Sequence, residues 1–196
     1  MYNKYKNDIM IVYQNEFVKD LCKEEHMKDK KIKLITLTSL FIALVVIGSR
    51  IYVGTHDTFR FHLGNSMCLL AGFVLPPLYG GIAAGVGSML FDILFYTSGP
   101  ACLVTLATKF VMGYVAGVFF EKTNNVVISG IVGEIAYIIL YALKTYIERR
   151  FILSMAFEAV VPIVLTKVGA SVFNAIAAVI ISSIIYKLIK SVKISI

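Results

Sequence analysis

Six long apolar segments follow one another along this chain, and they restrict its fold more than any other feature. A helix needs about 20 predominantly apolar residues to span a bilayer. Hydrophobic residues make up 58% of the 196 residues, too many for an ordinary soluble domain. The sequence therefore predicts an all-α integral membrane protein, a six-transmembrane-helix bundle with segments at Leu34–Val53, His62–Leu78, Gly80–Thr97, Ala101–Phe120, Val126–Tyr146 and Phe157–Leu188. The second segment is short enough for a tilt or a partial span, and the last can extend beyond the bilayer.

The basic residues indicate how the bundle is oriented. An even number of spans places both termini on one side, and Lys and Arg concentrate on the cytoplasmic side of membrane proteins. They gather before the first segment and after the last, at Lys28, Lys30, Lys31, Lys33, Lys187, Lys190 and Lys193. Both termini are therefore predicted to be cytoplasmic, although Arg149 and Arg150 then lie outside, against the rule. This flanking pattern accounts for the net charge of +7, so we expect no nucleic-acid partner.

The same orientation assigns the connections and the domains. Residues 1–33 are predicted to form a polar cytoplasmic N-terminal extension, and residues 34–196 the membrane domain. Residues 1–26 are interpreted as a dispensable extension or the result of a misplaced start codon, because Met27 and the basic stretch after it are typical of a bacterial membrane-protein start. We predict no cleaved signal peptide. The outside connections are Gly54–Phe61, Ser98–Pro100 and Ile147–Ala156, and the inside ones are Pro76–Tyr79 and Glu121–Asn125.

Segments two and three are predicted to form a helical hairpin inside the membrane. They meet at Pro76 and Pro77, where proline removes a backbone donor and ends a helix. Small residues let helix backbones approach closely in lipid. Segment three carries such a face at Gly81, Ala84, Gly85, Gly87 and Ser88, segment four carries Gly113 and Gly117, and segment one carries the pair Ser39 and Ala43. These positions are expected to be surfaces where other helices dock.

Four charged residues lie inside the apolar segments, and such residues are candidates for function. At about 1.5 Å of rise per residue, Asp92, Lys109, Glu134 and Lys167 all fall between the outer interface and the middle of the bilayer. Two are acidic and two are basic, so a polar pocket that opens outward explains them together. The alternative is that Asp92–Lys109 and Glu134–Lys167 are ion pairs that only hold helices together.

Other polar and aromatic residues extend this predicted pocket. Asn174 lies seven residues after Lys167, on the same helical face. Tyr137 and Tyr141 follow Glu134 on one face of segment five, where a planar ligand could stack; helix packing is the alternative reading. Arg60, His62 and Asn65 lie where the first outer loop enters segment two. Two interpretations are open for them: part of a lid over the pocket, or anchoring of the chain at the membrane interface. The cysteines and histidines show no metal-site spacing, so no metal or cofactor is predicted.

The hairpin and the segment after it resemble a known family. The motif residues are His62-Leu63-Gly64-Asn65, Pro77-Leu78-Tyr79-Gly80-Gly81, Gly85-Val86-Gly87-Ser88 with Asp92, and Lys109 with Met112-Gly113. They resemble the substrate-binding S components of energy-coupling factor (ECF) vitamin transporters, in the branch of riboflavin-, pantothenate- and hydroxymethylpyrimidine-type components. The resemblance is specific over about residues 60–120 and topological elsewhere. Pro76 stands where the family usually has Gly, which should stiffen the turn.

The resemblance implies that the chain binds a small water-soluble vitamin or vitamin precursor from the outside of a bacterial plasma membrane. It would deliver the vitamin together with a transmembrane coupling protein and two cytoplasmic ATPases. Ser39 and Ala43 would face the coupling protein, the loop Gly54–Phe61 would cap the ligand, and helices four to six would supply most ligand contacts. ATP hydrolysis would belong to the partners, because the chain has no P-loop motif and is not expected to be an enzyme.

Two other function classes remain as alternatives. A stand-alone secondary transporter or channel for a small polar solute would normally show inverted repeats or broken helices. A membrane-embedded enzyme would need a nucleophile or metal constellation. The sequence shows neither pattern. For the ligand, a pyrimidine or pyridine vitamin precursor is the first expectation, with riboflavin and pantothenate as alternatives.

Overall fold

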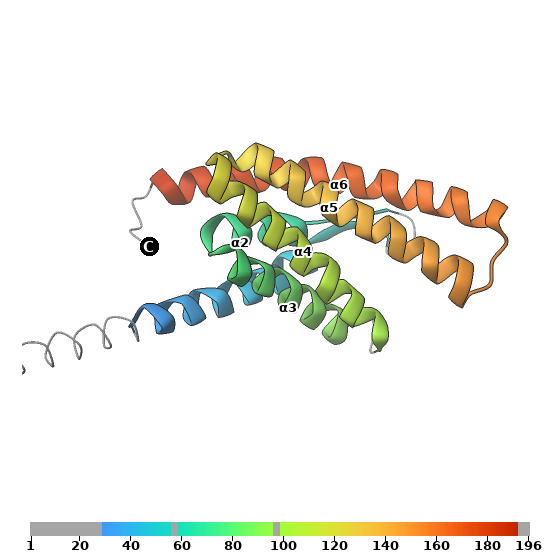
Figure 1. Cartoon of the computed structure of the whole chain (residues 1–196), viewed down its shortest axis with the longest axis horizontal. Coiled ribbons are helices and arrows are strands. Elements are labelled where there is room, and N and C mark those ends of the chain that lie inside the picture. The colour runs from blue at the N-terminus through green and yellow to red at the C-terminus, as the bar shows by residue number, and fades with distance from the viewer. Residues whose placement is uncertain (1–28, 56–58, 96–98, 192–196) are drawn as a thin grey trace, which may run out of the picture. The chain divides into compact units, whose positions relative to one another are not determined.

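The computed structural model describes residues 29–55, 59–95 and 99–191. The chain divides into two compact units, Met1–Leu37 and Thr38–Ile196. The described part of the first unit, residues 29–37, is helical. Along the chain, the elements in Figure 1 are a first helix (Asp29–Arg50), β1 (Tyr52–Thr55), β2 (Phe59–His62), α2 (Gly64–Val74), α3 (Pro77–Phe95), α4 (Pro100–Thr123), α5 (Val126–Ile147), the π-helical turn η1 (Glu148–Ile152) and α6 (Phe157–Ser191).

The predicted all-α membrane architecture is confirmed, with one helix shorter than expected. In the part of the chain that the structure describes, five helices are long and apolar enough to cross a membrane. The sixth, α2, has 11 residues and therefore covers only about 16 Å of a hydrocarbon core about 30 Å thick. The predicted segment His62–Leu78 was too long at both ends, because His62 belongs to β2 and Leu78 to α3.

A short β-hairpin replaces part of the predicted first helix and outer loop. The first helix ends at Arg50 instead of Val53, and β1 pairs antiparallel with β2, with Tyr52 opposite His62 and Thr55 opposite Phe59. Aromatic and β-branched residues dominate both strands, and these residue types favour the extended conformation. Residues 56–58 of the predicted lid lie outside the described residues.

The turn between α2 and α3 is shorter than expected: it begins one residue earlier, at Leu75, and ends at Pro76. Leu75 caps α2 in an extended conformation, and its backbone N–H donates to the Ala71 carbonyl. Pro77 then begins α3, because its fixed φ suits the first turn of a helix and its missing N–H would have no intrahelical partner there. The predicted connection Pro76–Tyr79 therefore shrinks, and Tyr79 is helical.

The predicted small-residue surface of the hairpin packs against α4. A Cβ added to Gly113 would lie 2.8 Å from the Gly80 carbonyl oxygen, and one added to Gly85 would lie 2.8 Å from the Leu106 carbonyl oxygen. A Cβ at Gly117 would lie 2.9 Å from Cα of Pro77. The backbones of α3 and α4 therefore touch along their length, as small residues permit in lipid. We call this contact the glycine seam.

Asparagines form the connection between α4 and α5. Asn124 adopts the left-handed conformation with φ of 50° and closes α4, while Asn125 caps α5 by accepting hydrogen bonds from the backbone N–H groups of Val127 and Ile128. The remainder of the predicted connection, Glu121–Thr123, is helical. The two helices are thus joined with almost no free chain.

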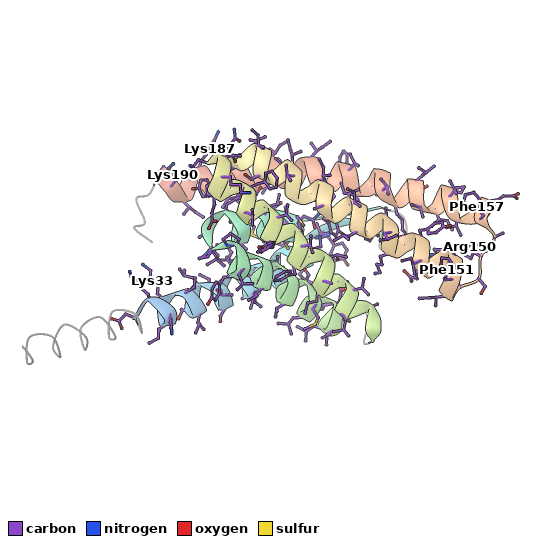
Figure 2. The ribbon with its side chains drawn as sticks, viewed as in Figure 1. Lys33, Arg150, Phe151, Phe157, Lys187 and Lys190 are labelled. Atoms are coloured by element: carbon purple, nitrogen blue, oxygen red, sulfur yellow. The ribbon has the colours of Figure 1, made fainter. Side chains whose placement is uncertain are left out.

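The pair α5 and α6 has an apolar surface between two charged ends. Ile135, Ile139, Leu143 and Ile147 recur every four residues on α5 and are 44–60% exposed, which is the surface that a helix presents to lipid. Figure 2 places Lys187 and Lys190 at one end of this pair and Arg150, Phe151 and Phe157 at the other. Basic side chains therefore lie at both ends, so the predicted orientation of the termini stays a prediction.

Candidate functional site

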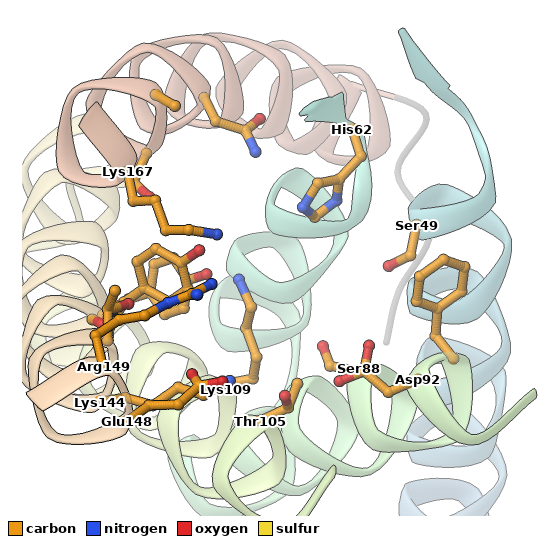
Figure 3. Close-up of a pocket in the computed structure, with 17 residues that line it drawn as sticks. Ser49, His62, Ser88, Asp92, Thr105, Lys109, Lys144, Glu148, Arg149 and Lys167 are labelled. Atoms are coloured by element: carbon orange, nitrogen blue, oxygen red, sulfur yellow. Dashed lines mark hydrogen bonds between the residues drawn. The ribbon is translucent and has the colours of Figure 1, made fainter. Parts of the chain in front are cut away.

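A cavity of about 430 Å³ lies among α3, α4, α5 and α6, and Ser49 of the first helix and His62 of β2 also line it. Figure 3 shows side chains from all these elements directed toward a common space. The size is within the range of about 300–1,000 Å³ that is typical of small-molecule sites. The cavity is therefore the candidate site.

Helical periodicity explains how α5 and α6 each supply four residues of its lining. Residues spaced by three, four and seven positions share one face of a helix. The cavity face of α6 carries Lys167, Ala170, Ser171 and Asn174, and that of α5 carries Tyr137, Tyr141, Lys144 and Thr145, with Glu148 following at the start of η1. The same spacing applies to Ser88, Phe91 and Asp92 on α3, and to Thr105 and Lys109 on α4.

Beneath the cavity, three buried polar residues from three helices form a connected cluster. Lys109 of α4 donates a hydrogen bond to Oδ1 of Asn65, and Nδ2 of Asn65 donates to Oε2 of Glu134 on α5 at 3.3 Å. The three side chains are only 5%, 1% and 2% exposed, respectively. We call this group the buried polar cluster. It compensates a buried cation and a buried carboxylate through a shared amide.

Aromatic rings cover this cluster on the cavity side. The Lys109 ammonium lies 3.5 Å from the centroid of the Tyr137 ring, a cation–π contact. The Tyr137 and Tyr141 rings stack with their centroids 5.7 Å apart and an interplanar angle of 27°. Both tyrosines also line the cavity. A planar ligand in the cavity would therefore meet an existing aromatic stack.

Most of the residues predicted from the sequence come together here, but not all of them reach the cavity. The lining includes His62, Asp92, Lys109, Tyr137, Tyr141, Lys167 and Asn174. Asn65 and Glu134 belong to the buried polar cluster, not to the lining. The side chain of Arg60 lies outside what the structure describes, although its backbone pairs with Gly54 in the hairpin.

The alternative of two structural ion pairs does not match the contacts. Within the described residues, no ion pair joins Asp92 to Lys109 or Glu134 to Lys167. Glu134 meets Asn65 through Oε2, and its other oxygen, Oε1, is buried without a hydrogen-bond partner. Asn174 Oδ1 is likewise buried without a partner, and Asn174 lines the cavity. Unused polar atoms near the cavity fit a site better than a closed structural network.

Sequence reasoning missed the part of the lining next to η1, at Lys144, Thr145, Glu148 and Arg149. Two signals could have found it. The spacing of Tyr137 and Tyr141 continues to Lys144, Thr145 and Glu148 on the same face of the helix. The other signal is that Arg149 was expected outside the membrane, where basic residues are less common. A basic residue in such a position often has a functional role. The π-helical turn η1 carries Arg149 into the cavity.

The predicted docking pair lies away from the cavity. Ser39 and Ala43 are exposed, whereas Thr38, Phe41 and Val45 on other faces of the same helix are buried. A Cβ added to Gly87 of α3 would lie 2.7 Å from Cβ of Val45, so this part of the first helix packs closely on α3. Among the described residues, no group of three or more His, Cys, Asp or Glu is placed to hold a metal ion.

One family model matches most of this chain. The model of the family described as "ECF-type riboflavin transporter, S component" matches residues 29–191. A Pyrococcus woesei protein, described as "Uncharacterized protein in gap 3'region", is 28% identical over 116 residues, which cover 58% of this chain and 72% of that protein.

Three solved structures share the fold. The S component of a bacterial ECF transporter has a TM-score of 0.62 at 19% identity, and the match covers 83% of this chain and 99% of that one. FolT bound with folic acid has a TM-score of 0.56 at 20% identity, covering 78% and 95%. The S component for biotin from an ECF-type ABC transporter has a TM-score of 0.56 at 18% identity, covering 83% and 93%.

Proposed function

The chain belongs to the family of S components of ECF-type riboflavin transporters, and from this membership we propose that the cavity among α3, α4, α5 and α6 binds a vitamin with a planar ring. As a member it is a multi-pass plasma-membrane protein and the substrate-binding component of an ECF transporter, not an enzyme. The proposal concerns which site in this chain binds the substrate and how.

The observation that carries the proposal is the cavity with the Tyr137–Tyr141 stack on one side and unused polar groups around it. A ring placed against Tyr141 would extend the stack, and aromatic pairs in such arrangements are favourable. Lys167 would donate a hydrogen bond to the ligand, and the side-chain amide of Asn174, which also lines the cavity, would provide a second polar contact. Both groups lie on the same face of α6.

The family description favours riboflavin as the first ligand to test. Solved relatives of the same fold include one bound with folic acid and one for biotin, so the fold accommodates different vitamins. A pyrimidine or pyridine vitamin precursor and pantothenate complete the set of candidates from the sequence. All of these combine a small polar skeleton with groups that the cavity can hydrogen-bond.

The partners implied by the family are a transmembrane coupling protein and ATPase subunits. We place the coupling surface at Ser39 and Ala43, because they form an exposed small-residue pair outside the cavity. Both termini are proposed to be cytoplasmic, with the cavity opening outward. In that orientation Lys187 and Lys190 mark the inner end of α6, and Arg150 and Phe157 lie at the outer end (Figure 2).

The direct test is to purify the chain alone in detergent and identify co-purifying small molecules by native mass spectrometry. Titration with riboflavin, pantothenate, folate, biotin and pyrimidine and pyridine vitamins follows. We expect one of them to co-purify or to bind with submicromolar affinity without ATPase subunits, and Lys167→Met to weaken that binding. Uptake in cells that depends on ATPase subunits would separate the proposal from a stand-alone transporter. Tight binding that Lys167→Met and Tyr141→Ala both leave unchanged would contradict the assignment of this cavity.

A further inference from the structure

Charges are unevenly distributed around the cavity, and we infer from this that the ligand carries an anionic group, a carboxylate or a phosphate. The group would bind at Lys144, Arg149 and Lys167, which we call the basic wall. This inference rests on the proposed function, because it names the charge class of the ligand in the same cavity.

The basic wall is built by α5, η1 and α6. Lys144 lies on the cavity face of α5, Arg149 on η1 and Lys167 on α6, and all three are half-buried and line the cavity. Figure 3 shows Lys167 and Arg149 directed into the same part of the space. Glu148 is the one acidic residue of the lining on this side. Three cations therefore share one carboxylate.

The opposite side of the cavity has a different character. Ser88 and Asp92 of α3 lie there with Ser49 of the first helix, across the space from Lys167 and Arg149 (Figure 3). Hydroxyl and carboxylate oxygens accept hydrogen bonds from N–H and O–H groups. A ligand that satisfies both sides has an anionic end and a donor-bearing end. The cavity is thus polarised along the direction in which a ligand would lie.

The protein itself provides little compensation for the basic wall. Like charges in a partly buried site repel more strongly than in water, because the effective dielectric constant is lower. Within the described residues, no ion pair engages Lys144, Arg149 or Lys167, and Arg149 Nε is buried without a hydrogen-bond partner. Lys109 differs from them, because it is held by Asn65 and by the Tyr137 ring. The basic wall is therefore available to a ligand, whereas Lys109 is largely used by the fold.

The residue types on the wall suit an oxyanion. Arginine presents planar donors that can form paired hydrogen bonds to a carboxylate or a phosphate, and lysine adds a mobile point charge. Asn174, seven residues after Lys167 on the same face, places a neutral side-chain amide in the cavity lining next to the anionic group. Carboxylates and phosphates share this chemistry, so the experiment has to separate them.

The test compares vitamins of nearly the same shape and different charge, using the full chain in detergent. Nicotinate against nicotinamide and pantothenate against panthenol test a carboxylate, and flavin mononucleotide against riboflavin tests a phosphate. We expect the anionic member of at least one pair to bind about 10-fold tighter or more, since hydrogen bonds to charged groups are the stronger class. Calorimetry or ligand-induced thermal stabilisation gives the ratio of dissociation constants within each pair.

A matched set of variants assigns the preference to the wall. Lys167→Gln should reduce the anion preference about 10-fold, and Lys167→Arg should retain most of it. Lys187→Gln makes the same charge change on the same helix at an exposed position, and should leave the ratio unchanged. Asp92→Asn should not reduce the preference, because it removes a negative charge from the opposite side.

The outcomes distinguish this inference from the proposed function. If neutral members bind as tightly as their anionic partners, the anionic ligand is refuted and the vitamin-binding cavity stands. If the anionic members bind more tightly but Lys167→Gln leaves the ratios unchanged, the assignment of the anionic group to the basic wall is refuted. If no compound of either charge binds, the proposed vitamin ligand and the anionic class both fail.

Discussion

The ammonium of Lys109 donates a hydrogen bond to the side-chain oxygen of Asn65, which joins α4 to the short helix α2 beneath the cavity. The amide of Asn65 turns the other way to donate to Glu134 on α5. One neutral side chain therefore connects two opposite charges on different helices. The sequence suggested Glu134 as a ligand group; in the structure Glu134 accepts a hydrogen bond from Asn65 and is not among the residues that line the cavity.

Replacing the central amide should destabilise the protein strongly. Asn65→Ala leaves both Lys109 and Glu134 buried without their shared partner, and uncompensated buried charges cost about 3–5 kcal/mol. We expect the melting temperature in detergent to fall by about 10 °C. Size-exclusion chromatography of samples heated to different temperatures measures this fall. Glu134→Gln is the matched control, because its amide oxygen still accepts from Asn65, and it should cost clearly less. Equal losses for the two variants would mean that Asn65 does not connect the charges.

The aromatic stack should contribute to ligand affinity through its ring and not through its hydroxyl group. Tyr141→Phe keeps the ring next to Tyr137, so binding should change little. Tyr141→Ala removes it, and the dissociation constant should rise about 3- to 10-fold, the value of an aromatic pair. Calorimetric titration with the co-purified vitamin measures both. A large effect of Tyr141→Phe would show instead that the hydroxyl group makes the important contact.

Substitution by alanine should change the stability of the protein differently at two glycines. Gly113→Ala places a Cβ 2.8 Å from the Gly80 carbonyl oxygen, so the glycine seam must open and the protein should lose stability. Gly169→Ala meets nothing within 4 Å, and should be neutral or stabilise α6 by up to about 1 kcal/mol, the helix-propensity difference between the two residues. Thermal unfolding of both variants under the same conditions tests the pair. A destabilised Gly169→Ala variant would contradict the open surroundings of that residue.

Bulky residues at the proposed coupling surface should block assembly and spare ligand binding. Ser39→Trp and Ala43→Trp enlarge an exposed face of the first helix that lies away from the cavity. Co-purification with the coupling protein and ATPases should be lost, while the vitamin still binds to the isolated chain. Ile139→Trp is the control, because it adds an exposed aromatic residue to the lipid-facing side of α5. Normal assembly of both first-helix variants would move the coupling surface elsewhere.

Much of the fold could be predicted because the bilayer imposes a simple rule of length and polarity. The hairpin turn at Pro76 and Pro77 and the close packing of Gly113 and Gly117 both followed from local chemistry. The limits of α2 did not follow, because apolar residues continue on both sides of it. The pairing of β1 with β2 limits α2 at its beginning, and the start of α3 at Pro77 limits it at its end.

The candidate site could be located by depth, but its contacts could not. Asp92, Lys109 and Lys167 were predicted near the same level of the membrane, and all three line the cavity. Which charges meet depends on the rotation of each helix about its axis, and sequence spacing within one helix does not determine that rotation. For this reason the sequence suggested Asp92–Lys109 and Glu134–Lys167 as possible ion pairs, whereas in the structure the neutral Asn65 joins Lys109 to Glu134.

The glycine seam also makes the α3–α4 side of the cavity stiffer than the α6 side. Where α3 and α4 touch through their backbones, there are few side-chain rotamers that could change to let the helices separate. In α6, Pro162 removes one backbone hydrogen bond and Gly169 has open surroundings, so this helix can bend at a lower energetic cost. A ligand of larger volume should therefore displace α6 and leave α3 and α4 in place. The stiff pair then sets the smallest distance across the site, and the compliant helix sets the range of ligand sizes that the transporter accepts.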